Sequence, residues 1–296
     1  MIYDGTNKNK CFESLLGDLA KIVRAELAQI GVKASGDDNK VFNDFFAIHK
    51  RLIKPKPRKI LRSKEFKCPP NLSAKLATLE GKIRNGDDLV PHSSRAIAGK
   101  SKSTKPDQML NDWNIHHLHF EAAGGLNEIL FVLITDSTAY EIGIYDHNSW
   151  ADTELLEIIN GNWPNLLDPY RLKGVTDISF SPDSETVKEF RKAQINTCIQ
   201  LRDGSCYSPP GGGYVADGTN QNAVLSANSY RRYINKILCD IIKDTKNILK
   251  IPSLEGRDLS LEKLDDDIYI VITDSASPNT SINRAKIKHY KDFLDN

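Results

Sequence analysis

The sequence lacks several features that would place its 296 residues in a specialised class of protein. No run approaches the roughly 18 consecutive apolar residues that a membrane-spanning helix needs. The first ten residues, MIYDGTNKNK, have no apolar core like that of a signal peptide. The five cysteines are scattered, form no CxxC pair and are odd in number, which argues against a disulfide framework or a zinc ribbon. We therefore expect a cytoplasmic protein with no membrane partner.

An excess of charge of one sign is also lacking, because 40 Lys and Arg stand against 39 Asp and Glu. The balance hides an asymmetry along the chain. Residues 1–106 carry 22 basic and 11 acidic side chains, whereas residues 107–296 carry 18 basic and 28 acidic ones. This division predicts a basic partner-binding region joined to an acidic or neutral remainder. Two solvated surfaces of opposite sign are the alternative interpretation.

The apolar pattern predicts an α+β fold, with a basic helical N-terminal region followed by a mostly antiparallel sheet with flanking helices. Three regions are expected: 1–106, 107–170, and an α+β region 171–296 that either stands alone or continues the preceding sheet. Helices are expected over 11–31, from Val41 to Leu52, and over 72–83, with a linker over 98–106.

A meander of three strands is predicted over 115–120, 128–135 and 138–146, followed by a helix over 149–163. The elements expected after it are a strand over 175–181, a capped helix over 181–194, a hairpin around Asp203–Gly204, a mobile surface loop over 209–222, a helix over 228–249 and a buried strand over 266–277.

Residues 50–67 hold nine cations and a single acidic residue, Glu65. Pro55 and Pro57 prevent a regular helix, so an extended basic arm is expected. Such an arm would contact RNA phosphates, giving affinity and salt dependence but little sequence specificity. Alternatively, it is neutralised by the acidic half of the chain. The predicted nucleic-acid-binding residues are Lys50, Arg51, Lys54, Lys56, Arg58, Lys59, Arg62, Lys64 and Lys67.

Three of the seven histidines lie within IHHLHF, residues 115–120. On a strand His117 and His119 project to one face and His116 to the other. A pair on one face suits acid–base chemistry or metal binding. No HExxH arrangement or nearby cysteine is present, so no metal site is predicted. A polar strand face with satisfied imidazoles is the alternative.

Tyr145 lies near the end of the third predicted strand, and His147 lies at the junction between this strand and the predicted helix, which contains Trp150. Metal-independent ribonucleases need a base, an acid and cations, and they need no cofactor. Histidines and a tyrosine near a basic arm would supply these roles. The alternative is that Tyr145 and Trp150 are core residues and that His147 caps the helix.

The succession IHHLHF, EILFVLIT, TAYEIGIYDHNSW resembles the C-terminal sheet of RelE-type mRNA interferase toxins over residues 107–163. In that family the last strand ends in a Gly-His-Arg-like step, where this chain has Tyr145-Asp146-His147-Asn148 without the arginine. The resemblance implies a ribonuclease or ribosome-directed effector, with His117, His119 and His147 as first candidates.

Three functions therefore stand as hypotheses. The first is a metal-independent ribonuclease or toxin-like effector acting on RNA or the translation machinery, with His117, His119, His147 and Tyr145 as catalytic residues. The second is a non-catalytic RNA- or ribosome-binding protein. The third is a host-defence or interaction protein whose basic arm binds an acidic protein, including a neutralising antitoxin.

Overall fold

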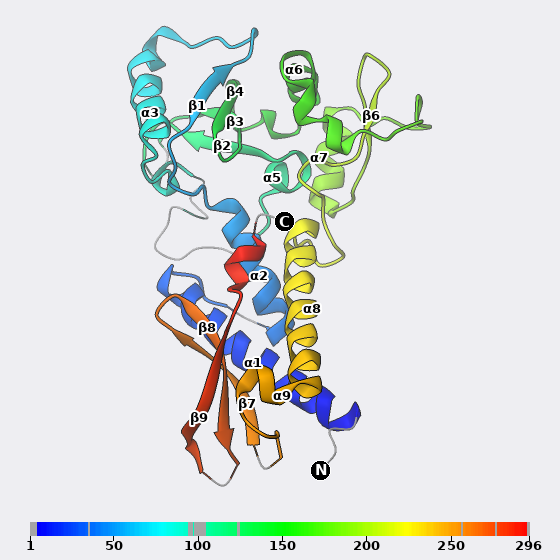
Figure 1. Cartoon of the computed structure of the whole chain (residues 1–296). Helices are drawn as coiled ribbons and strands as arrows, with labels where there is room; N and C mark the ends of the chain where they lie inside the picture. Colours follow the sequence, from blue (N-terminus) through cyan, green and yellow to red (C-terminus); the bar gives the residue numbers. More distant parts are fainter. Residues whose placement is uncertain are drawn as a thin grey trace. The chain divides into compact units, whose positions relative to one another are not determined.

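Helices and mostly antiparallel sheets make up the chain, which confirms the predicted α+β class (Figure 1). The structure is a computed structural model that describes residues 5–34, 36–93, 97, 105–122, 125–255, 257–275 and 277–294. Two compact units are present: unit 1 is Met1–Phe46 with Ala223–Asn296, and unit 2 is Ala47–Asn222.

Unit 1 contains an antiparallel sheet in the order β7-β8-β9. Its strands are β7 (Arg257–Leu264), β8 (Asp267–Asp274) and β9 (Ser277–Ile287). Alternate residues of β8, such as Ile268 and Ile270, are fully buried, as its central position requires. The helical elements in this unit are α1 (Gly5–Gln29), which packs on β7, the larger part of α2 (Asp38–Arg51), nearly all of α8 (Gln221–Lys243), α9 (Thr245–Leu249) and η6 (Tyr290–Phe293).

Unit 2 is built on a four-stranded sheet in the order β1-β4-β3-β2. β2, β3 and β4 pair antiparallel in sequence order, so the predicted meander is confirmed. β1 pairs with β4 and is parallel to it. A bulge interrupts the pairing of β3 with β4 between Phe131 and Val132. The strands are β1 (Lys59–Arg62), β2 (Ile115–His119), β3 (Glu128–Ile134) and β4 (Thr138–Asp146).

The two faces of this sheet are covered by different helices (Figure 1). α3 (Ser73–Asn85) packs on one face, where alternate residues such as Leu118 and Leu130 meet its Leu76 and Leu79. The other face holds the larger core of unit 2. This face is covered by α5 (Gln108–Trp113), η3 (Ser149–Ala151), α6 (Glu154–Asn162) and α7 (Ser184–Ala193). Unit 2 also contains the short elements η1 (Pro70–Leu72), η2 (Val90–His92), η4 (Pro164–Leu166) and η5 (Asp168–Tyr170).

The basic segment 50–67 is extended after α2, as expected, but its centre is β1 rather than a free arm. β1 hydrogen bonds to the edge of β4, from Lys59 opposite Thr138 to Arg62 opposite Glu141. Residues on both sides of position 106 therefore share one sheet. The predicted divisions at 106 and 170 both fall inside unit 2, and residues 98–104 of the predicted linker lie outside the described residues.

Several predicted elements differ from the structure. No strand covers 175–181, which is irregular chain. The helix expected over 228–249 begins at Gln221 and is divided at Asp244, whose side chain caps α9. The hairpin around Asp203–Gly204 is confirmed as β5 (Ile199–Gln200) and β6 (Cys206–Tyr207).

The glycine-rich part of the loop 209–222 is packed rather than a mobile surface. Gly211 N donates to the Asp112 carbonyl oxygen at 2.8 Å, and Gly213 N donates to that of Asn111 at 2.8 Å. Lys50 Nζ also donates to the Gly211 carbonyl oxygen, at 2.7 Å. These partners at the end of α5 and in α2 are distant in sequence, so local composition gave no sign of them.

Candidate active site

Three of the four residues predicted as catalytic form a row in unit 2. The ring centroids of His117 and His119 are 6.0 Å apart, and those of His119 and His147 are 5.2 Å apart. His117 and His119 share the face of β2 that meets the larger core, because their partners on β3 are Phe131 and Ile129. The predicted sharing of one face is confirmed.

The row runs from solvent into the protein. His147 is exposed, and its Nδ1 lies 2.8 Å from the Asn127 carbonyl oxygen. Since a carbonyl only accepts, Nδ1 carries the hydrogen, and Nε2 of the neutral ring holds the lone pair. His119 is buried, and its own carbonyl oxygen accepts a hydrogen bond from His92 Nδ1 at 2.8 Å.

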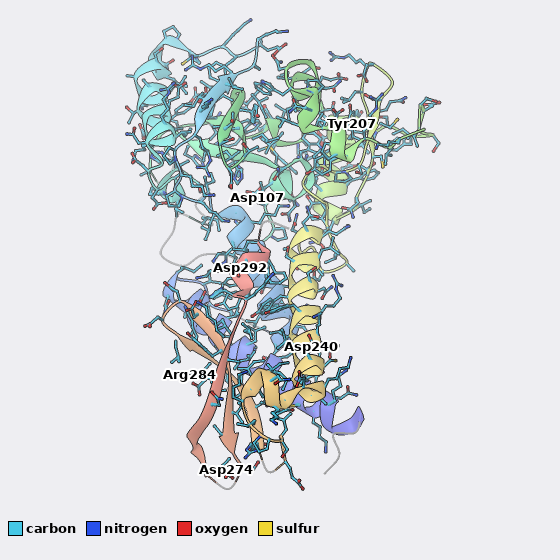
Figure 2. All side chains as sticks on the ribbon, in the orientation of Figure 1. Asp107, Tyr207, Asp240, Asp274, Arg284 and Asp292 are labelled. Atoms are coloured by element: carbon cyan, nitrogen blue, oxygen red, sulfur yellow. The ribbon has the colours of Figure 1, made fainter. Side chains whose placement is uncertain are left out.

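His117 lies beside a carboxylate. Its Nδ1 is 3.8 Å from Asp107 Oδ2, and the two side chains are 21% and 14% exposed. Asp107, labelled in Figure 2, is the N-cap of α5, where its Oδ1 accepts from Leu110 N at 3.1 Å. The N-terminus of α5 thus fixes the Asp107 carboxylate in place beside the His117 imidazole.

His117 also lines a cavity of about 280 Å³. Arg51 enters it from the last turn of α2, and its Nη1 donates to the Lys105 carbonyl oxygen at 2.9 Å. One of the predicted RNA-binding cations therefore lies at the same cavity as a predicted catalytic histidine. The lining residues are Arg51, Lys105, Pro106, Asp107, Gln108, Met109, His117 and Trp150.

His116 points to the opposite face, towards the α3 side, because its partner Val132 belongs to that core. Burial, together with the charges of Lys50 and Arg58, lowers the pKa of His116 to about 4. The ring is neutral at physiological pH and stands apart from the row.

Tyr145, the fourth predicted catalytic residue, belongs to the core. Its ring stacks on Phe131, with centroids 5.1 Å apart, and covers Gly143. Burial raises the pKa of its phenol, and the nearby Asp152 carboxylate adds to the effect. This packing agrees with the alternative interpretation of Tyr145 as a core residue.

The nine cations of segment 50–67 divide by their surroundings. Several are held by partners within unit 2: Lys50 by Gly211 and Asn220, Arg51 by Lys105, Lys56 by Asp136, Arg58 by Thr135, and Arg62 by Glu80 and Glu141. Lys54 is half-buried. Lys59, Lys64 and Lys67 are exposed, and Arg62 is exposed as well although it forms two ion pairs. These exposed cations lie on β1 or shortly after it, and β1 is the edge of the sheet opposite β2. Three strand spacings, about 14 Å, separate these two edges.

Asp107 was not among the residues predicted for the site. The only local signal is the N-cap pattern, in which an Asp precedes a short helical segment. A buried network beside the cavity was missed as well: Arg191 pairs with Asp112 at 2.8 Å, and its guanidinium lies 3.9 Å from the Trp113 ring centroid. Arg191 and Asp112 are 79 positions apart, so no local pattern links them.

The fold and the site together define an α+β protein with a row of imidazoles that ends at an arginine-lined cavity. Within the described ranges, no group of three or more His, Cys, Asp or Glu side chains is arranged to hold a metal ion. None of the helices described has the length and apolarity that a bilayer-spanning segment needs. The chain matches no protein-family model, no curated protein and no solved structure.

Proposed function

We propose that this protein is a metal-independent endoribonuclease, a toxin-like effector that acts on RNA or on the translation machinery. The observation that carries the proposal is the row of His117, His119 and His147, which ends at the cavity lined by Arg51. Acid–base cleavage of RNA needs a base, an acid and a nearby cation, and two imidazoles with an arginine can supply all three.

The geometry suggests a role for each end of the row. His147 Nε2 takes the proton of a ribose 2′-hydroxyl, whose oxygen then forms a bond to phosphorus. The bond from phosphorus to the 5′-oxygen breaks, and the leaving oxygen receives a proton from His117, whose Nδ1 lies 3.8 Å from Asp107 Oδ2. The products are a 2′,3′-cyclic phosphate and a 5′-hydroxyl. Arg51 and the central His119 offset the charge that develops on the phosphorane oxygens.

The test is cleavage of end-labelled single-stranded RNA by the full chain in the presence of EDTA. We expect His117→Gln and His147→Gln each to slow cleavage by about 10²- to 10⁴-fold. His289→Asn is the matched control: this histidine lies in unit 1, where Asn can also cap η6. Cleavage at the wild-type rate by both His117→Gln and His147→Gln would overturn the assigned site.

A second candidate function, RNA or ribosome binding without cleavage, is favoured by the exposed cations along β1. Lys59→Glu, Lys64→Glu and Lys67→Glu combined should weaken RNA binding and reduce its salt dependence, because each lost phosphate contact lowers the slope. Salt-sensitive binding by the wild-type chain with no product after long incubation would support this candidate over the nuclease.

A further inference from the structure

The cavity holds groups that the proton transfers do not use. Trp150 and Gln108, which carry an indole ring and a side-chain amide, both line it. Its volume of about 280 Å³ is close to the lower bound of small-molecule sites. A single planar ring system, rather than a whole dinucleotide, suits this size.

Trp150 is held firmly from behind. Arg191 is 1% exposed, and its Nη1 donates to the Trp150 carbonyl oxygen. The same guanidinium lies 5.6 Å from the Trp150 ring centroid and is anchored by Asp112. Because its backbone and one side of its ring are fixed in this way, Trp150 is a rigid platform on which a base can stack.

The polar groups around the cavity present a donor fork and acceptors. Arg51 supplies a guanidinium, whose Nη1 donates to the Lys105 carbonyl oxygen. Asp107 Oδ2 is 3.8 Å from His117 Nδ1, a separation longer than a hydrogen bond, so this oxygen can accept from a ligand N–H.

Gln108 adds a second acceptor. Its Nε2 donates to the Arg191 carbonyl oxygen at 2.9 Å, which leaves the amide oxygen as the group able to accept. The set is therefore one guanidinium donor with carboxylate and amide acceptors, beside a stacking surface.

Guanine is the base that complements this set. It offers neighbouring acceptors, O6 and N7, to an arginine fork, and N–H donors on its other edge to a carboxylate. Adenine places an amine where guanine has O6, and a pyrimidine has a smaller stacking surface.

We propose that the cavity of Arg51, Asp107, Gln108 and Trp150 is a base-recognition subsite that selects guanine in single-stranded RNA. The inference rests on the proposed nuclease function, because His117 at the same cavity would then protonate the leaving oxygen of the phosphate that follows the bound guanosine.

Calorimetric binding of the four nucleoside 3′-monophosphates to the full chain tests the subsite without any cleavage. We expect 3′-GMP to bind at least about tenfold more tightly than the adenosine, cytidine and uridine compounds. Asp107→Asn, which retains a capping side chain for α5, and Trp150→Leu should each remove most of this preference. Trp163→Leu is the matched control, because Trp163 packs on the same core but does not line the cavity.

The cleavage assay separates the two proposals. Cleavage mainly after guanosine, reduced when inosine replaces guanosine, is the expected result, since inosine lacks the 2-amino donor. Cleavage without preference for any base, or equal binding of the four nucleotides, would overturn the subsite and leave the nuclease standing. Selective binding of 3′-GMP with no RNA cleavage would overturn the nuclease and retain guanine recognition.

Discussion

Glu141 offers a direct test of how the sheet of unit 2 tolerates a buried charge. Its side chain is 0% exposed on β4, where it accepts a hydrogen bond from Arg62 Nε at 3.0 Å. Arg62 also pairs with Glu80 of α3, which in turn binds Arg84 at 2.8 Å. Burial, and then the neighbouring Glu80 carboxylate, raise the pKa of Glu141 to about 7.

The direction of the pH effect follows from the raised pKa. A carboxyl group whose folded-state pKa exceeds its ordinary value stabilises the fold fully below that ordinary value, and the stabilisation is lost as the pH rises through the folded-state pKa. Moving the pKa of Glu141 from 4.5 to about 7 corresponds to about 3 kcal/mol. Because the ordinary pKa lies only just below pH 5, most of this stabilisation is still present at pH 5. Roughly 2–3 kcal/mol of it should then be lost between pH 5 and pH 8.

Glu141→Gln keeps the shape and an acceptor for Arg62 but cannot ionise. We expect the difference in free energy of unfolding between this variant and wild type to shift in favour of the variant by roughly 2–3 kcal/mol from pH 5 to pH 8. Urea unfolding followed by tryptophan fluorescence measures unit 2, because Trp113, Trp150 and Trp163 all lie within it. Glu185→Gln, at an exposed position of α7, is the control. Parallel pH profiles for wild type and Glu141→Gln would refute the reasoning.

Two further changes test the packing of unit 2. The folded-state pKa of His116 is about 4, against an ordinary 6.5, so the stability that the neutral ring contributes is present above pH 6.5 and is lost as the pH falls through 4. In urea unfolding, His116→Gln should therefore remove about 2–3 kcal/mol of the loss in stability that acid causes. An unchanged loss of stability at acid pH would contradict this. Gly211→Ala would place a Cβ against the carbonyl oxygens of Leu110 and Asn111 and should cost about 1–3 kcal/mol of stability, measured by thermal unfolding. Gly161→Ala on α6 is the control: its Cβ meets nothing within 4 Å, so this change should be neutral or stabilising in that measurement.

Local patterns predicted the parts of the fold whose partners are close in sequence. Alternation over 115–120, the apolar run over 128–135 and the turn residues between the strands were sufficient for the meander, because each strand pairs with the next along the chain. The same alternation predicted that His117 and His119 share a face. The turn residues Asp203–Gly204 predicted the short hairpin, where Gly204 adopts a φ of 81°.

Contacts between distant segments could not be predicted in this way. Segment 50–67 shows its charge and its prolines, but nothing local indicates that Lys59–Arg62 joins β4. Likewise, no pattern around His117 indicates that Arg51, at the end of α2, lines the same cavity. The composition of the glycine-rich loop indicated mobility, because the carbonyl oxygens that hold Gly211 and Gly213 lie about a hundred positions earlier.

The parallel pairing of β1 also has a consequence for the order of folding. Arg62 and Glu141 are 79 positions apart, whereas β3 and β4 are joined by a short turn. Contacts that close long loops form slowly, so we expect the meander to assemble first and β1 to add to it late. The exposed lysines beside β1 would then gather into a cationic edge only in chains that have nearly finished folding. Pulse-labelled hydrogen exchange should show protection of the Lys59 and Ser63 amides, which donate to the Ser137 and Glu141 carbonyl oxygens, after that of β3 and β4. Simultaneous protection would contradict this order.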